Sequence, residues 1–120
     1  MKASDLPLPV ARGRRVPGRM NRTEQAYADR LELRRYAGEV AWWSFEGLTF
    51  KLGPDLRYTP DFPVMLADGT IEIHEVKGGF ARDDSKGKFQ MAAGLFPFVF
   101  RWCVYKGERW TITTPYAEDR

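Results

Sequence analysis

The chain has 120 residues, of which 43% are hydrophobic and 14% aromatic, so it holds enough apolar side chains for one folded domain. Its 19 basic and 16 acidic residues leave a net charge of +3, and the longest apolar run, Met91 to Phe100, is too short for a membrane span of about 20 residues. With one cysteine and one histidine, an internal disulfide and a Cys- or His-cluster zinc site are excluded. We expect no secretory signal, and we expect Cys103 to be a buried thiol in a reducing compartment, the cytoplasm.

The N-terminus carries the positive charge. Residues 1–22 contain six basic residues and one acid, whereas the rest of the chain contains 13 basic and 15 acidic residues. Prolines and glycines disfavour regular structure there, so residues 1–20 are predicted to form a flexible basic arm. Such an arm suits a phosphate backbone, but it could equally be a solubilising tail or become ordered only against a partner chain. The candidate nucleic-acid contacts in the arm are Arg12, Arg14, Arg15 and Arg19.

A capping-box pattern opens the body of the chain. Asn21 is followed three residues later by Glu24, which predicts a helix over residues 22–37. Glu24 shares a helical stripe with Tyr27 and Leu31, so we expect it to point toward the sheet. Runs of aromatic and β-branched residues, separated by turn residues, predict the strands that follow. The further elements are a hairpin of Val40–Phe45 and Leu48–Leu52, extended Leu56–Leu66, strand Thr70–Lys77, helix Asp83–Leu95, strands Phe98–Tyr105 and Arg109–Thr114, and a frayed end at 117–120.

This order predicts an α/β (α+β) domain over residues 21–116, with helices packed on a sheet. Within Leu56–Leu66, two prolines confine the chain to an edge strand, an irregular strand or a bend. Trp42 and Trp43 are adjacent in a predicted strand and must face opposite ways, so one of them is a candidate for an interface. A homodimer is therefore one expectation for the assembly.

Two carboxylates are predicted to lie opposite each other. A hairpin turning at Asp68-Gly69 would bring Asp61 beside Glu75, because each lies seven positions from residue 68. Period-two alternation also places Lys77 on the face of Glu75. Two carboxylates this close repel unless a divalent cation lies between them or one is protonated. Oxygen ligands favour Mg²⁺ or Mn²⁺.

Each of these residues also has a purely structural interpretation. Glu75 and Lys77 could be a solvated ion pair at a strand end, and Asp61 after Pro60 could belong to an ordinary turn. Glu24 could serve only as a helix cap. His74 is expected to be structural, since it lies on the opposite face of its strand.

Pro60-Asp61 followed by Glu75-Val76-Lys77 resembles the PD-(D/E)xK nuclease superfamily, with a layout most like small phage-encoded and junction-resolving endonucleases. The helical Glu24 upstream and the helix and strand downstream fit that superfamily's restriction-endonuclease-like αβββαβ core with a mixed central sheet. The resemblance implies that Asp61, Glu75 and the Val76 backbone carbonyl would hold Mg²⁺ or Mn²⁺, and that Glu24 would either complete the ligands of this metal or position a second one. It also implies that Lys77 would activate the attacking water and stabilise charge on the phosphate.

The implied function is Mg²⁺-dependent hydrolysis of DNA phosphodiester bonds by an endonuclease, in phage or prophage DNA processing within a host cytoplasm. Branched DNA is among the candidate substrates. Arg82, Lys86 and Lys88 near the second helix are further candidate phosphate contacts, although a solvated helix face is the alternative. Two other functions stay open: a non-catalytic nucleic-acid-binding protein with a nuclease-like fold, and a structural protein in which the charged residues form a buried ion network.

Overall fold

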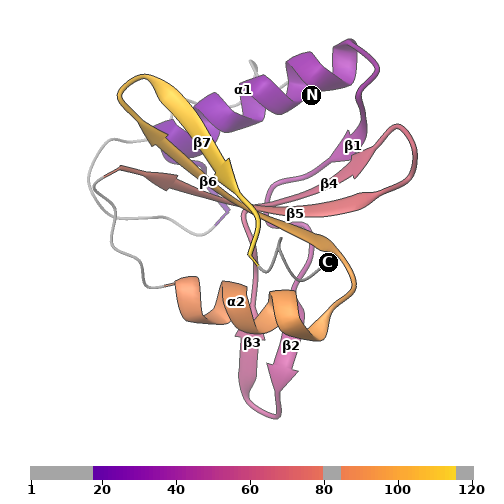
Figure 1. The fold of residues 1–120 in the computed structure, drawn as a ribbon, viewed down its shortest axis with the longest axis vertical. Coiled ribbons are helices and arrows are strands. Elements are labelled where there is room, and N and C mark those ends of the chain that lie inside the picture. Colours follow the sequence, from indigo (N-terminus) through magenta and orange to yellow (C-terminus); the bar gives the residue numbers. More distant parts are fainter. Residues whose placement is uncertain (1–17, 80–84, 116–120) are drawn as a thin grey trace.

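The computed structural model describes residues 18–79 and 85–115 (Figure 1). The predicted contacts Arg12, Arg14, Arg15 and Arg82 and the predicted frayed end at 117–120 lie outside these residues. A five-stranded mixed sheet has the order β1-β4-β5-β6-β7, and β2 and β3 form a separate ribbon. The elements are α1 (Arg22–Tyr36), β1 (Val40–Trp43), β2 (Phe50–Gly53), β3 (Leu56–Tyr58), β4 (Phe62–Leu66), β5 (Ile71–Gly78), α2 (Lys86–Leu95), β6 (Val99–Lys106) and β7 (Arg109–Thr113).

The capping box at the start of α1 is confirmed. The Glu24 backbone nitrogen donates to Asn21 Oδ1 at 2.8 Å, and the Asn21 backbone nitrogen donates to Glu24 Oε1 at 2.9 Å. The side of α1 that carries Tyr27 and Leu31 is buried, and Glu24 is buried with it. Tyr36, which ends the helix, is 76% exposed, so the buried stripe does not reach the last turn.

The tight turn at Asp68-Gly69 joins β4 to β5 as predicted. Gly69 has a φ of 89°, a backbone conformation that favours glycine, and Asp68 Oδ1 accepts a hydrogen bond from the Thr70 nitrogen at 2.9 Å. The strands are antiparallel and pair Phe62 with His74. The predicted register is therefore confirmed, and Asp61 and Glu75 are the next residues along it.

The predicted hairpin of Val40–Phe45 with Leu48–Leu52 is wrong. β1 pairs with β4 in the main sheet, whereas β2 pairs with β3. A two-residue hairpin turn of the favoured type needs positive φ at both central residues, and here Glu46 has it while Gly47 does not. The chain instead continues along β4, where the Glu46 nitrogen donates to the Asp61 carbonyl at 2.7 Å.

The predicted extended segment Leu56–Leu66 divides at Pro60 into β3 and β4, which belong to different sheets. Of the alternatives for this segment, a bend is therefore what the structure shows. Pro63 lies in β4, an interior strand, and not at an edge. It is tolerated because its backbone faces β1, where it only accepts a hydrogen bond, from the Ser44 nitrogen at 3.2 Å.

Two apolar clusters hold the layers together, one on each face of the sheet. On one face α1 packs through Tyr27 and Leu31 against the sheet side chains Phe62 and Cys103. On the other, Phe89 of α2 and residues of the β2–β3 ribbon pack on the sheet. Figure 1 shows α1 above the sheet and α2 with the ribbon below it. Cys103 is a buried free thiol, as expected.

The fold class predicted from the sequence, α/β (α+β), is confirmed. The chain order α1, β1, β4, β5, α2, β6 follows the expected αβββαβ order, with the β2–β3 ribbon inserted and β7 added. β6 runs parallel to β5, and α2 forms the crossover between them. Within the described residues, no helix has the length and apolar character needed to cross a membrane.

Candidate active site

Asp61 lies at the bend between β3 and β4 and is only 1% exposed. Its Oδ2 accepts a hydrogen bond from the Val76 backbone nitrogen at 2.8 Å. If the β4–β5 pairing continued, Pro60 would lie opposite Val76. The chain has left the sheet by that point, so no β4 residue pairs with Val76. The Asp61 carboxylate therefore satisfies a strand N–H that would otherwise be buried without a partner, and this bond orients the side chain at the end of the strand pair.

Glu75 collects polar partners from three segments of the chain. It is 2% exposed, and the Tyr58 hydroxyl donates to its Oε1. The Ser85 hydroxyl donates to Oε2 at 3.2 Å, and the Lys77 ammonium lies 3.3 Å from the same oxygen. Tyr58 comes from β3 and Ser85 precedes α2, so the carboxylate is held where the ribbon, the central strand and the second helix meet.

The electrostatics of Glu75 are unusual for a carboxylate. Burial disfavours its charged form and the negative charge of Asp61 acts in the same direction, so the pKa of Glu75 is raised to about 7. The hydrogen bond from Tyr58 and the charge of Lys77 oppose this rise in the pKa only in part. Around neutral pH, Glu75 can therefore gain or lose a proton, or accept a cation in place of one.

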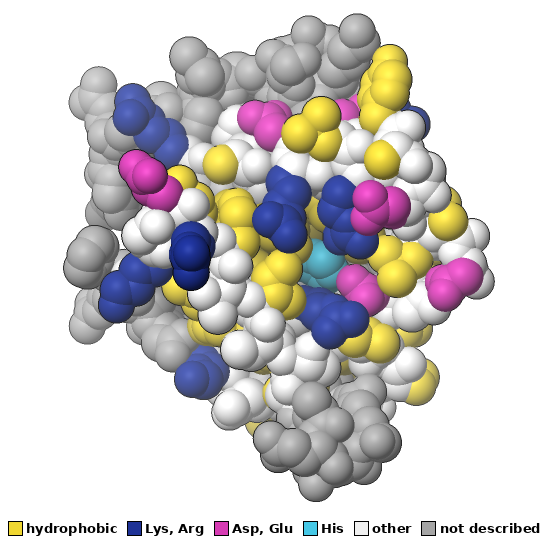
Figure 2. All heavy atoms as spheres, turned by 45° about the horizontal axis from the view of Figure 1, so that its top comes forward, with side chains coloured by type: hydrophobic (Ala, Val, Ile, Leu, Met, Phe, Trp, Pro, Cys, Tyr) yellow, Lys and Arg dark blue, Asp and Glu magenta, His cyan; other side chains and the backbone are white. Residues whose placement is uncertain are grey.

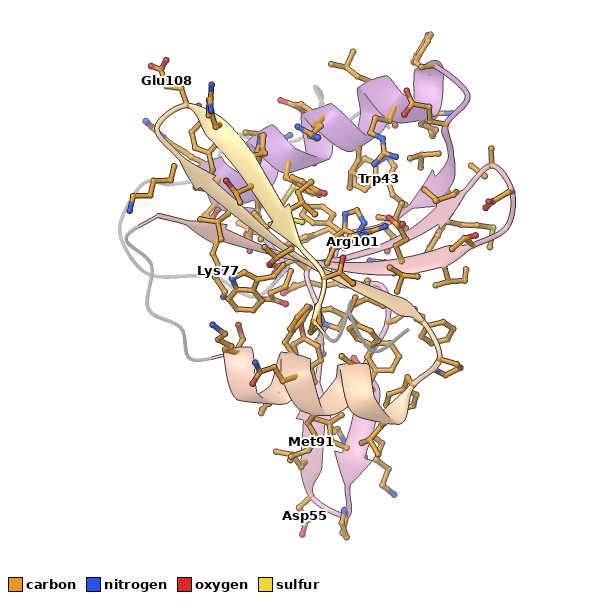
Figure 3. The ribbon with its side chains drawn as sticks, in the orientation of Figure 1. Trp43, Asp55, Lys77, Met91, Arg101 and Glu108 are labelled. Carbon is orange, nitrogen blue, oxygen red and sulfur yellow. The ribbon has the colours of Figure 1, made fainter. Side chains whose placement is uncertain are left out.

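A cavity of about 250 Å³ opens beside Glu75. Three cationic side chains line it, namely Arg57, Lys77 and Lys88. Figure 3 shows Lys77 at the end of β5, on the opposite side of the sheet from the labelled Arg101. The cavity thus combines one carboxylate with three cationic side chains, which suits a phosphate approaching a cation-binding carboxylate.

The sequence reasoning missed Arg57, Tyr58 and Ser85 as members of this site. Tyr58 stands just before Pro60-Asp61, in the extended segment Leu56–Leu66 for which the sequence leaves an edge strand, an irregular strand or a bend open. The signal that could have found it is the proline itself, since a bend there turns the preceding residues out of the main sheet. Ser85 has no signal in the sequence beyond its place ahead of a predicted helix.

Glu24 lies in the first turn of α1, which is beside the end of β5. A Cβ on Gly78 would come within 3.5 Å of Thr23 Oγ1, which shows how closely the two elements approach. The carboxylate of Glu24 serves the capping box through Oε1. In the part of the chain that is described, no three His, Cys, Asp or Glu side chains gather closely enough to hold a metal ion.

The donor atoms at the site nevertheless fit a hard divalent cation. Asp61 and Glu75 offer carboxylate oxygens, and the alternation of backbone groups along β5 turns the Val76 carbonyl to the β4 side, the side of Asp61. All of these are oxygen ligands, which suit Mg²⁺ and Mn²⁺. The repulsion that raises the pKa of Glu75 is also what a bound cation would relieve.

Only some of the predicted nucleic-acid contacts lie near the cavity beside Glu75. Lys88 lines the cavity, whereas Lys86 lies beside it, with its ammonium 5.9 Å from the Trp102 ring centroid. Arg19 is exposed just ahead of α1. Two of the three described candidates thus lie on or next to the wall of the cavity.

His74 belongs to a separate polar network on the α1 face. Its Nδ1 lies 2.6 Å from the Tyr27 hydroxyl and its Nε2 lies 2.8 Å from Glu72 Oε1. Arg101 donates to the other oxygen of Glu72 at 2.9 Å. Burial lowers the pKa of His74. Figure 2 shows this side chain at the bottom of a surface opening, between basic and acidic side chains. The network supports a structural role for His74.

Comparisons of the chain with protein-family models, with curated proteins and with solved structures found no match of any of the three kinds.

Proposed function

We propose that the protein is a metal-dependent endonuclease that hydrolyses DNA phosphodiester bonds. The observation that carries this proposal is the cavity in which buried Glu75, next to Asp61, lies 3.3 Å from the Lys77 ammonium and is flanked by further cations. A solvated ion pair would not be buried, and a simple turn would not direct Asp61 onto the Val76 nitrogen. The PD-(D/E)xK-like order of these residues agrees with the proposal.

Each side chain has a role in the proposed reaction. Asp61, Glu75 and the Val76 carbonyl would hold the divalent ion, which supplies an activated water and neutralises charge on the phosphate when it is bound. The Lys77 ammonium provides positive charge where negative charge develops on the phosphate oxygens. Arg57 and Lys88 on the cavity wall position the phosphate backbone. Phage or prophage DNA processing in a host cytoplasm remains the proposed setting.

A non-catalytic nucleic-acid-binding protein is the second candidate, and one observation favours it. Within the described residues no third acid joins Asp61 and Glu75, and both oxygens of Glu75 already have protein partners. Glu24 is engaged in the capping box through one of its carboxylate oxygens, Oε1. The two candidates differ in one measurable property, which is cleavage that depends on a divalent metal.

The deciding experiment replaces Lys77 with Ala and measures cleavage of labelled linear, single-stranded and branched DNA with Mg²⁺, Mn²⁺ or chelator. Because Lys77 would stabilise charge in the transition state, we expect cleavage to fall by about 100-fold or more. Melting temperature and DNA affinity in chelator should stay near those of the wild type. Lys51→Ala, at an exposed position of β2, is the matched control and should cleave normally.

Two outcomes would contradict the proposal. If the wild type cleaves no form of DNA with either metal, the binding-only function is favoured. If Lys77→Ala unfolds instead of losing activity, Glu75 and Lys77 form a structural ion network.

A further inference from the structure

A second cavity, of about 190 Å³, lies between α2 and the strands β6 and β7. Its wall combines apolar and polar side chains, which include Phe89, Trp102 and Pro115 together with Lys86, Gln90 and Thr113. A phosphate site would be dominated by cations, and an acyl-chain site would lack the amide and the hydroxyl groups. The mixture therefore suits a flat apolar group with a polar edge.

Trp102 connects this cavity to the one beside Glu75. The ammonium of Lys77 lies 5.8 Å from the Trp102 ring centroid, and the ammonium of Lys86 lies 5.9 Å from it. Lys77 lines the first cavity, whereas Trp102 and Lys86 line the second. A chain of nucleotides whose phosphate lies at Lys77 would therefore pass Trp102 and reach the second cavity.

The second cavity offers both kinds of contact that a nucleobase makes. Trp102 packs edge-to-face on Phe89, with ring centroids 5.0 Å apart, so its ring is held in place by the core. The Gln90 amide can donate and accept hydrogen bonds. The Thr114 hydroxyl accepts from Arg101 at 2.6 Å, which leaves its own hydrogen available to donate. Proteins bind unstacked bases through such aromatic surfaces and base-edge hydrogen bonds.

We propose, building on the nuclease function above, that this second cavity binds an unpaired nucleobase next to the phosphate that is cleaved. A base inside a continuous duplex is stacked on both faces and can enter a concave pocket only after it has been flipped out of the helix, which costs unstacking and unpairing free energy. The substrate class is therefore DNA with unpaired bases near the cleavage point, which includes single strands, flaps and open branch points. Uninterrupted linear duplex is the disfavoured substrate.

Binding in chelator tests the proposal without cleavage. Fluorescence anisotropy compares end-labelled single strands with duplexes of equal length, and we expect the wild type to bind the single strand about tenfold more tightly. Trp102→Leu should lower single-strand affinity by about tenfold and change duplex affinity by less than about twofold. Trp42→Leu, at a tryptophan that is 43% exposed on β1, is the matched control and should change neither.

A second variant guards against a folding defect in Trp102→Leu, whose ring packs on the core. Gln90 is exposed on α2, so Gln90→Ala should fold normally and should reduce single-strand affinity several-fold. The inference is overturned if both variants bind single strands like the wild type, or if Trp102→Leu weakens single-strand and duplex binding equally.

Cleavage of the same oligonucleotides with Mg²⁺ separates this inference from the proposed function. If cleavage depends on metal but neither variant changes single-strand binding, the proposed base site is wrong and the nuclease function is supported. If single-strand binding is selective and depends on Trp102 but no DNA is cleaved, the nuclease function is wrong and the base-binding site is supported.

Discussion

At the scale of single residues, the proposed chemistry depends on Glu75. It is buried beside another acid, and the two effects together bring its pKa to about 7. The residue could be located from the sequence, because the hairpin turn sets the register that puts it opposite Asp61. Its raised pKa could not be predicted in this way, because the rise comes first from burial of the carboxylate in the folded protein and then from the charge of Asp61.

The raised pKa of Glu75 makes the stability of the metal-free protein depend on pH. The folded protein holds this proton up to about pH 7 and the unfolded chain releases it near pH 4.5, so stability present below pH 4.5 is lost as the pH rises through 7. Glu75→Gln lacks this titration. In chelator, we expect the unfolding free energy of the wild type to fall relative to the variant by about 1–3 kcal/mol between pH 4.5 and pH 8.

Urea unfolding of both proteins across this pH range measures that difference. Groups that titrate in both proteins cancel in the comparison. A difference that stays constant with pH would show that Glu75 is ionised throughout. Adding Mg²⁺ at pH 8 should raise the stability of the wild type more than that of Glu75→Gln, because the cation takes the place of the proton.

At the scale of secondary structure, patterns that span a few residues predicted the start of α1 and the turn between β4 and β5 correctly. The capping box that begins α1 and the Asp68-Gly69 turn are both local, since the interacting groups lie within three residues of each other. The hairpin expected around Glu46-Gly47 failed because its strands have better partners elsewhere, β4 for one and β3 for the other. Which strands pair with each other depends on how their side chains are buried on the two faces of the sheet.

The capping box yields a prediction that distinguishes the two roles of Glu24. Asn21→Ala should lower the unfolding free energy by about 1 kcal/mol, because the Glu24 backbone N–H loses its acceptor. Glu24→Gln keeps the box but removes the charge, so it should keep both stability and metal-dependent cleavage. Thermal unfolding and a cleavage assay provide the measurements. Lost cleavage at normal stability would instead assign Glu24 to the metal.

At the scale of the whole molecule, the two faces of the sheet serve different purposes. The α1 face holds a satisfied buried network around His74, whereas the other face holds the two adjoining cavities. The charge is also divided, because the excess of basic over acidic residues lies in the first 22 positions. Trp42 is the exposed member of its pair and Trp43 donates to Glu32 at 3.0 Å, so Trp42 is the candidate for a dimer contact.

The N-terminal charge leads to a prediction about salt dependence. Removing residues 1–17 deletes Lys2 and three arginines but keeps Met20, which packs on the α1 cluster. Each lost phosphate contact should reduce the slope of log affinity against log salt by about 0.9 for duplex DNA, so we expect a reduction of about one to three. DNA binding measured over a salt series checks this.

A full-length variant with the same four basic residues changed to Gln is the control, and it should match the deletion. Metal-dependent cleavage should persist in both proteins. A salt slope equal to that of the wild type would show that these residues do not contact phosphate.

Features that depend on neighbouring residues could be predicted from the sequence alone. These are the cap of α1, the turn at Asp68-Gly69 and, through that turn, the pairing that brings Asp61 to Glu75. Three features depend on contacts that form only in the folded chain: the bend at Pro60, the hydrogen bond from Tyr58 to Glu75, and the position of Trp102 in the second cavity next to Lys77. The physical reason is the separation in sequence of the interacting residues. Capping and turn formation involve residues a few positions apart, whereas burial and charge coupling arise between segments that only folding brings together.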